Sequence, residues 1–152
     1  MTVTLLPARP DDAPVLAALM DELERFYGGA PTEPLEDQVA QIKDALFGET
    51  PAAHALIAWD GETPAGFASY SFLWPAAGFT RSLYLKELYV AQAWRRTGLG
   101  RLLMDELHAI ARRESCSRVE WTTDAPNDAA RRFYASLGYA ENESKVFYRS
   151  TL

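Results

Sequence analysis

The chain contains six short segments in which apolar residues either alternate with polar ones or run together. These segments are residues 2–6, 54–59, 65–73, 81–90, 118–123 and 146–149. A period of two is typical of β-strands, because successive side chains of a strand point to opposite faces. The sequence Asp60-Gly61-Glu62-Thr63 joins the second and third segments and carries the Asp-Gly signal of a hairpin turn. We therefore expect six strands, three of which follow one another along the chain.

Four other segments repeat their apolar residues every three or four positions, which is typical of amphipathic helices. We expect these helices from residue 11 or 12 to about 28, from about 35 to 48, from 98 to 113 and from 128 to 137. Asp11 or Asp12 is a favourable N-cap for the first helix, and Gly28 is a favourable terminator.

The order of these elements predicts a mixed α/β fold. Three consecutive strands favour antiparallel pairing, whereas the later strand–helix–strand alternation favours a parallel crossover. We expect a mostly antiparallel central sheet with helices on both faces. The 152 residues contain no repeat or linker, so the pattern predicts one domain over residues 1–152.

Composition narrows the possible partners. The net charge of −6 argues against nucleic acid, because phosphate binding needs clustered basic residues, and it is compatible with cationic substrates. One cysteine and two histidines give no basis for a disulfide or a metal site. The sequence shows neither a secretion signal nor an apolar run of about 18 residues, so we expect a cytoplasmic protein without membrane contact.

Residues 95–101, Arg-Arg-Thr-Gly-Leu-Gly-Arg, stand between a predicted strand and a predicted helix. Glycines at a helix start let an anion approach the unpaired N–H groups there, and three arginines add positive charge. The alternative is a tight turn that needs only a positive φ angle. Nucleotide-binding patterns fit less well: no glycine pair is followed by Lys and Ser or Thr, and Leu103 replaces the third glycine of the dinucleotide motif.

The stretch from Arg95 to Gly100 matches the R/Q-x-x-G-x-G/A signature of the GNAT superfamily of N-acetyltransferases, which this sequence resembles. The preceding residues 84–90 look like the family's fourth strand. Residues 127–139 look like its N-x-x-A-x-x-F-Y-x-x-L-G-F/Y segment, about 30 residues further on. Residues 84–100 and 35–47 are most similar to the diamine and spermidine/spermine acetyltransferase branch.

The resemblance implies direct transfer of an acetyl group from acetyl-CoA, as co-substrate, to an amine, without a metal. The cofactor-binding residues it implies are Leu88, Tyr89, Val90, Arg95, Arg96, Thr97, Gly98, Leu99, Gly100, Arg101 and Asn127. The pyrophosphate is expected on the turn and the pantetheine arm beside residues 88–90. Asn127 is equally suited to be the N-cap of the helix that follows it.

Two catalytic residues are implied in the same way. Tyr134 occupies the general-acid position, although an aromatic residue on the core face of a helix is the alternative. Glu87 occupies the position of a general base, although it could only shape the local charge. Strand alternation places Glu87 and Tyr89 on one face, and Lys86, Leu88 and Val90 on the other. Polyamine enzymes usually carry an acidic residue where this chain has Lys86, which puts polyamine specificity in doubt.

In relatives, the first two helices and the loop after the third strand frame the acceptor. Here these elements include Tyr27, Glu33, Glu36 and residues 70–79, within which residues 74–79, beginning at Trp74, form an apolar loop. We expect a small-molecule primary amine as acceptor, polyamine-like or amino-acid-like, and a homodimer. The alternatives are a protein lysine or N-terminal acetyltransferase and a non-catalytic CoA-binding sensor.

Overall fold

The computed structural model describes residues 2–31 and 33–152. These residues fall into two compact units, Met1–Thr122 and Thr123–Leu152. The single domain predicted over residues 1–152 therefore stays a prediction. The larger unit contains the sheet and three of the predicted helices, and the smaller contains the fourth.

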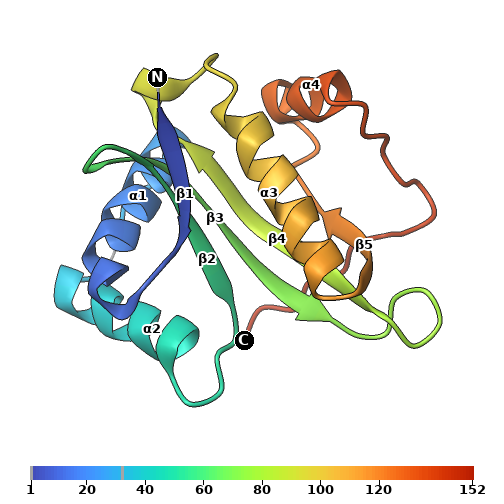
Figure 1. The fold of residues 1–152 in the computed structure, drawn as a ribbon, viewed down its shortest axis with the longest axis horizontal. Coiled ribbons are helices and arrows are strands. Elements are labelled where there is room, and N and C mark those ends of the chain that lie inside the picture. Colours follow the sequence, from blue (N-terminus) through green and yellow to red (C-terminus); the bar gives the residue numbers. More distant parts are fainter. Residues whose placement is uncertain (1, 32) are drawn as a thin grey trace. The chain divides into compact units, whose positions relative to one another are not determined.

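The larger unit is built on one five-stranded sheet in the order β1-β2-β3-β4-β5 (Figure 1). The strands are β1 (Val3–Pro7), β2 (His54–Asp60), β3 (Thr63–Leu73), β4 (Arg81–Val90) and β5 (Cys116–Trp121). The first four strands pair antiparallel with their neighbours, and β5 pairs parallel to β4. This mixed, mostly antiparallel sheet confirms the predicted fold class.

Helices cover the sheet of this unit. They are α1 (Ala13–Phe26), preceded by the 3-10 turn η1 (Pro10–Asp12), α2 (Leu35–Phe47), and α3 (Leu99–Arg113), preceded by the 3-10 turn η2 (Gln92–Trp94). Leu16 and Leu19 of α1 pack in one cluster with Ile57 and Phe67 of the sheet. The helix α3 is the crossover between β4 and β5 and contacts both strands. Its Leu103 is fully buried. The helical boundaries agree with the sequence prediction to within a few residues.

A β-bulge in β4 shapes the region that matters most for function. Leu85 pairs with Tyr70 and Glu87 pairs with Ser69, so Lys86 is an extra residue without a partner in the β3 register. A bulge bends its strand and re-aims the side chains beyond it. The predicted alternation is therefore wrong at Lys86, whereas Glu87 and Tyr89 do share a face. Pairing of β4 with β5 ends just before the bulge, at Leu85 opposite Trp121.

The smaller unit contains α4 (Asp128–Ser136). The strand predicted at residues 146–149 is absent: these residues pair with no strand within the described ranges. Their side chains are exposed, including Phe147 and Tyr148. Apolar alternation alone does not make a strand, because a strand needs a neighbour to satisfy its backbone groups. Among residues 2–31 and 33–152, no helix has the length and apolar character needed to span a membrane.

Candidate active site

The last part of β4 has one edge without a strand neighbour in the part of the chain that the structure describes. The Ala91 N–H donates to the Ala65 carbonyl at 2.9 Å, on the β3 side. Because backbone groups alternate between the two edges of a strand, those of Leu88 and Val90 point to the opposite edge. On that edge β5 has already separated at Leu85. The Leu88 backbone groups and the Val90 N–H are thus placed where an extended ligand could pair with them.

The predicted anion-binding turn follows directly and contains two left-handed residues. Arg96 has a φ angle of 63°, and Gly98, the N-cap of α3, has a φ angle of 88°. A methyl group at Gly98 would meet nothing within 4 Å, so backbone conformation rather than space favours glycine there. Thr97 Oγ1 donates to the Trp94 carbonyl. Trp94 Nε1 in turn donates to Asp60 Oδ2 at 2.9 Å and ties the turn to the end of β2.

The N-terminus of α3 presents backbone donors. The first N–H group bonded within the helix is that of Leu102, which donates to the Gly98 carbonyl at 3.1 Å. The N–H groups of residues 99–101 precede it, and Gly98 has no side chain that could cap them. The tight-turn and anion-site interpretations are therefore compatible. The left-handed Arg96 left no signal in the sequence, because arginine has no preference for positive φ.

Arg95, one of the three arginines predicted to add positive charge to the turn, is held by contacts with β4 and α1. Its Nε donates to the Val90 carbonyl at 3.0 Å. Its guanidinium carbon lies 4.1 Å from the centre of the Phe26 ring and 5.8 Å from that of Tyr89. Arg96 and Arg101 are exposed instead. They are the arginines that remain available to an anion.

Tyr89 connects the same region to α1. Its hydroxyl donates to Glu22 Oε2 at 3.2 Å. Burial raises the pKa of Tyr89, and the neighbouring Glu22 carboxylate raises it further, because a second negative charge beside a carboxylate is unfavourable. The phenol is thus kept neutral, and it serves as a donor that fixes α1 against β4.

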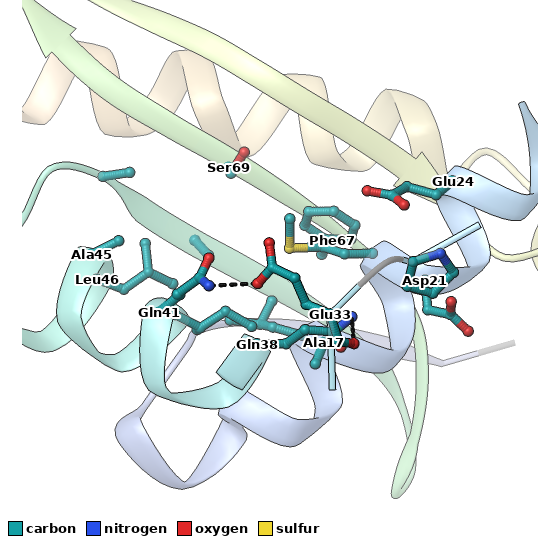
Figure 2. Close-up of a pocket in the computed structure, with 16 residues that line it drawn as sticks. Ala17, Asp21, Glu24, Glu33, Gln38, Gln41, Ala45, Leu46, Phe67 and Ser69 are labelled. Atoms are coloured by element: carbon teal, nitrogen blue, oxygen red, sulfur yellow. Dashed lines mark hydrogen bonds between the residues drawn. The ribbon is translucent and has the colours of Figure 1, made fainter. Parts of the chain in front are cut away.

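A pocket of about 380 Å³ opens between α1, α2 and the sheet. Figure 2 shows its lining, in which the side chains of Phe67 and Ser69 come from β3 and those of Gln38 and Gln41 from α2. Asp21 and Glu24 of α1 and Glu33 of the α1–α2 connection supply carboxylates. The volume and the mixture of apolar walls with a few polar groups are typical of small-molecule sites.

The predicted acceptor residues are distributed unevenly around this pocket. Glu33 lines it. Tyr27 and Glu36 are exposed and do not belong to its described lining. Trp74 lies in the β3–β4 loop, where its Nε1 donates to the Phe79 carbonyl at 2.8 Å. The acceptor roles of these four residues stay predictions. No pattern in the sequence predicted that the carboxylates of Asp21 and Glu24 would line a pocket, since charged residues on a helix are usually solvated.

Tyr70 and Phe72, at the start of the predicted acceptor segment 70–79, lie on the face of the sheet opposite the pocket. Ser69 lines the pocket, so the next residue, Tyr70, points to the other face of the sheet. Tyr70 stacks on His54, with 5.4 Å between ring centres, and Arg81 lies over the Phe72 ring at 4.8 Å. Burial raises the pKa of Tyr70, and the nearby Glu114 carboxylate adds to this.

Glu87 is half-buried and stands opposite Ser69 in the β3–β4 register. Since paired residues share a face, Glu87 lies on the side of the sheet that carries the pocket. This position agrees with a general base for an amine in the pocket, although the role itself stays a prediction.

The two predicted residues of the smaller unit belong to α4 and its cap. Asn127 Oδ1 accepts from the Ala130 N–H at 3.1 Å, which is the capping bond expected of an N-cap asparagine. Tyr134 is half-buried, with its ring centre 5.1 Å from that of Phe133. A pantetheine contact of Asn127 and a general-acid role of Tyr134 stay predictions. Within the described ranges, no three metal-binding side chains come together.

Residues 16–139 match the Acetyltransferase (GNAT) family, which covers most of the chain and includes the β4 edge, the turn and α4. The chain belongs to the GNAT acetyltransferase family. It is thus an N-acyltransferase, and the β4 edge and the turn lie within the matched residues.

Individual relatives of this GNAT protein agree with the assignment. A thialysine N-epsilon-acetyltransferase of Caenorhabditis elegans is 28% identical over 137 residues, which cover 89% of this chain and 81% of the relative. This similarity is consistent with the diamine and polyamine branch.

Solved structures show the same fold. An integron cassette protein from the mobile metagenome of V. cholerae superposes with a TM-score of 0.90 at 29% identity, over 99% of this chain and 93% of that one. The aminoglycoside N-acetyltransferase AAC(6')-Iy, solved in complex with CoA, superposes with a TM-score of 0.80 over 99% of this chain and 96% of that one. At 18% identity, this second likeness concerns the fold alone.

Proposed function

We propose that this GNAT protein transfers the acetyl group of acetyl-CoA to the primary amine of a small molecule. The observation that carries the proposal is the open edge of β4, which leaves β5 at Leu85 and leads into the Arg95–Gly100 turn. The pocket on the Glu87 face supplies a place for an acceptor.

The residues present fit the cofactor. The backbone groups of Leu88 and the Val90 N–H are suited to pair with the amides of a pantetheine arm, whereas the Val90 carbonyl already accepts from Arg95 Nε. The N–H groups at the start of α3 are suited to a pyrophosphate, since a helix N-terminus attracts anions. Exposed Arg96 and Arg101 add positive charge beside it. The related fold of AAC(6')-Iy in complex with CoA supports this cofactor.

The acceptor must lose a proton before it can attack. A primary amine has a pKa near 10.4, so its neutral form at pH 7 costs roughly 4.6 kcal/mol. A positioned carboxylate typically contributes a rate factor of about 10²–10⁴ as general base. Glu87 is our candidate because it shares the pocket's face with Ser69. The amine nitrogen then forms its bond to the acetyl carbon.

The carbon–sulfur bond breaks as the new amide forms, and the sulfur leaves as a thiolate that takes up a proton. A thiol has a pKa near 8.5 and a phenol near 10, so a tyrosine can donate this proton at modest cost. Tyr134 is our candidate for this general acid. Asn127 is our candidate for a contact with the pantetheine amides in addition to its capping bond.

The finer points that the resemblance implies belong to the same proposal. They are a polyamine-like or amino-acid-like acceptor, a cytoplasmic location, a homodimer and one domain over residues 1–152. Light scattering coupled to gel filtration tests the dimer directly: a molar mass near 17 kDa would contradict it, because one chain has a mass of 16.9 kDa.

The deciding experiment measures thiol release from acetyl-CoA with a panel of acceptors, for the wild type and Tyr134→Phe. The panel contains diamines, spermidine, lysine analogues, aminoglycosides and a lysine peptide. Release with a small amine that falls at least tenfold in Tyr134→Phe supports the proposal. Release with the peptide alone would support a protein acetyltransferase, and cofactor binding without any release would support a sensor.

A further inference from the structure

The β2–β3 hairpin places an acidic side chain beside the turn proposed to bind the pyrophosphate. Asp60 is the last residue of β2, and its Oδ2 accepts from Trp94 Nε1 at 2.9 Å. Asp60 forms no ion pair with any basic side chain that the structure describes, so no cation there cancels its charge. A carboxylate repels an anion that binds nearby. An acidic residue at this position therefore calls for a function that outweighs the repulsion.

The backbone of Asp60 is held from both sides. Asp60 pairs with Val3 of β1 and with Thr63 of β3. Its side chain is half-buried, and so is the ring of Trp94. A hydrogen bond to an ionised acceptor is stronger than one between neutral groups, and partial removal from water strengthens it further. Asp60 is therefore a rigid anchor for Trp94.

Trp94 is the residue through which the turn is held. Its N–H donates to the Ala91 carbonyl at 2.9 Å, and its carbonyl accepts from Thr97 Oγ1. Its ring packs against the hydrophobic cluster formed by α1 and the sheet. Together with the bond to Asp60, these contacts fix the backbone both before and after Arg96.

Arg96 has a conformation that depends on such contacts. Its φ angle of 63° is unfavourable for a residue with a side chain, and it persists only where the surroundings enforce it. The next left-handed residue, Gly98, leads directly into the first N–H groups of α3. If the turn relaxed in the free protein, cofactor binding would have to order it again, and the affinity would fall.

We infer that Asp60 is a positioning residue for the pyrophosphate, which acts through Trp94 by holding the turn in its binding conformation. This inference rests on the proposed function, in which the turn binds the pyrophosphate of acetyl-CoA. The two effects of removing Asp60 have opposite signs. Loss of its negative charge alone would tighten the binding of an anion, whereas loss of the anchor weakens it.

Calorimetric titration with CoA measures this effect without turnover. Asp60→Ala and Trp94→Phe are each expected to raise the Kd for CoA about tenfold, because each removes the same charge-assisted hydrogen bond. The double variant should bind CoA within about twofold of the weaker single variant, since one bond is lost only once. Asp60→Asn keeps an acceptor oxygen for the indole and should stay within about threefold of the wild type. Glu62→Gln removes an exposed carboxylate from the turn of the same hairpin and should keep the wild-type Kd.

A shortened cofactor separates the turn from the rest of the site. S-acetylpantetheine carries the thioester and both amides but no pyrophosphate, so its reaction does not use the turn. With acetyl-CoA and the best amine of the acceptor panel, Asp60→Ala should raise KM for the cofactor about tenfold and keep kcat within about twofold. With S-acetylpantetheine, its kcat/KM should stay within about twofold of the wild type. Equal losses with both cofactors would indicate general damage to β4 and overturn the role of Asp60.

The outcomes are distinguishable. If Asp60→Ala binds CoA as tightly as the wild type or more tightly, or if the losses in the double variant are additive, the role of Asp60 is overturned and the acetyltransferase proposal stands. A wild type that does not bind CoA would contradict both. CoA binding without thiol release would contradict turnover alone, because the titrations still test Asp60. Thermal unfolding shows whether each variant is folded during the titration; if Asp60→Ala is not, Trp94→Phe, which keeps an aromatic ring, decides.

Discussion

Gly66 lies where β3 and β4 approach closely. A methyl group added there would stand 2.5 Å from the Tyr89 carbonyl oxygen and 3.3 Å from Val90 Cα. Both atoms belong to the backbone and cannot turn away as a flexible side chain can. Glycine at this buried position therefore sets the local distance between the two strands, beside the residues proposed to bind pantetheine.

Replacement of Gly66 by alanine should consequently affect both stability and cofactor binding. We expect Gly66→Ala to lower the free energy of unfolding by about 1–3 kcal/mol, as over-packing usually does. Displacement of Tyr89 and Val90 should also weaken acetyl-CoA binding. Urea unfolding and calorimetric titration measure the two effects. Gly29→Ala is the control, because its methyl would lie 3.4 Å from the Glu24 carbonyl oxygen; similar losses in both variants would contradict the prediction.

Tyr89 predicts a pH dependence at the alkaline end. Its pKa is raised above the ordinary 10.0 by burial and then by Glu22. For an acid with a raised pKa in the folded state, the folded form keeps its proton longer than the unfolded form. The stabilisation is fully present below about pH 10 and is lost as the pH rises through the folded-state pKa.

The matched variant isolates this contribution. Unfolding free energies measured between pH 9 and 11 should fall more steeply for the wild type than for Tyr89→Phe, which has no phenol to ionise at this position. The pKa of Tyr70 is also raised, but Tyr70 is present in both proteins, so its contribution to the pH dependence cancels in the comparison. Parallel curves for the two proteins would argue against the role of Tyr89.

At the scale of elements, α1 and the turn before α3 are joined through side chains. Arg95 donates a hydrogen bond to the carbonyl at the end of β4, and its guanidinium lies over the ring of Phe26, the last residue of α1. The helix α1 also lines the pocket proposed for the acceptor, with Leu16, Ala17, Met20, Asp21 and Glu24. The Arg95–Phe26 contact therefore connects a helix that lines this pocket to the turn proposed to hold the pyrophosphate.

Loss of this contact should disturb cofactor binding from a distance. We expect Phe26→Ala to raise KM for acetyl-CoA about two- to fivefold, with little change in kcat, because an exposed cation–π contact contributes about 0.5–1 kcal/mol. Phe26→Tyr keeps an aromatic face and should behave like the wild type. Steady-state kinetics with saturating acceptor measure the effect, and an unchanged KM in Phe26→Ala would show that the contact does not position the turn.

At the scale of the molecule, cofactor binding should stabilise the folded state. A ligand that binds only the folded protein adds roughly 2.7 kcal/mol at a concentration 100 times its Kd. We expect acetyl-CoA to raise the melting temperature in a concentration-dependent manner. Gly98→Ala strains the turn at a φ angle of 88° and should reduce this ligand-induced rise, independently of its own lower melting temperature. A full rise in Gly98→Ala would contradict the proposed site.

Local patterns in the sequence were enough to predict the type and approximate bounds of most elements. Residues 81–90 were predicted as a strand and form β4, and residues 98–113 were predicted as the helix that α3 forms from Leu99. These segments can be predicted because burial of one face of a strand or helix makes apolar residues recur with a period of two or 3.6 residues. Residues 146–149 show the limit of such reasoning, since a strand also needs a neighbour that no local pattern specifies. Gly98 could be predicted as a turn residue because its backbone conformation depends on the residue type at that one position.

How these elements form a candidate site depends on contacts that exist only in the folded chain. The extra residue in β4, Lys86, is defined by its mismatch with β3, and the separation of β5 at Leu85 follows from pairing across the sheet. Arg95 was predicted only as a positive charge beside the turn, whereas the structure places it over Phe26, nearly 70 positions earlier in the chain. The carboxylates of Asp21, Glu24 and Glu33 likewise resemble solvated surface residues until α1 and α2 pack against β3. Local patterns record which side of an element is buried, whereas pockets, bulges and charge pairs arise from contacts between elements that are distant in sequence.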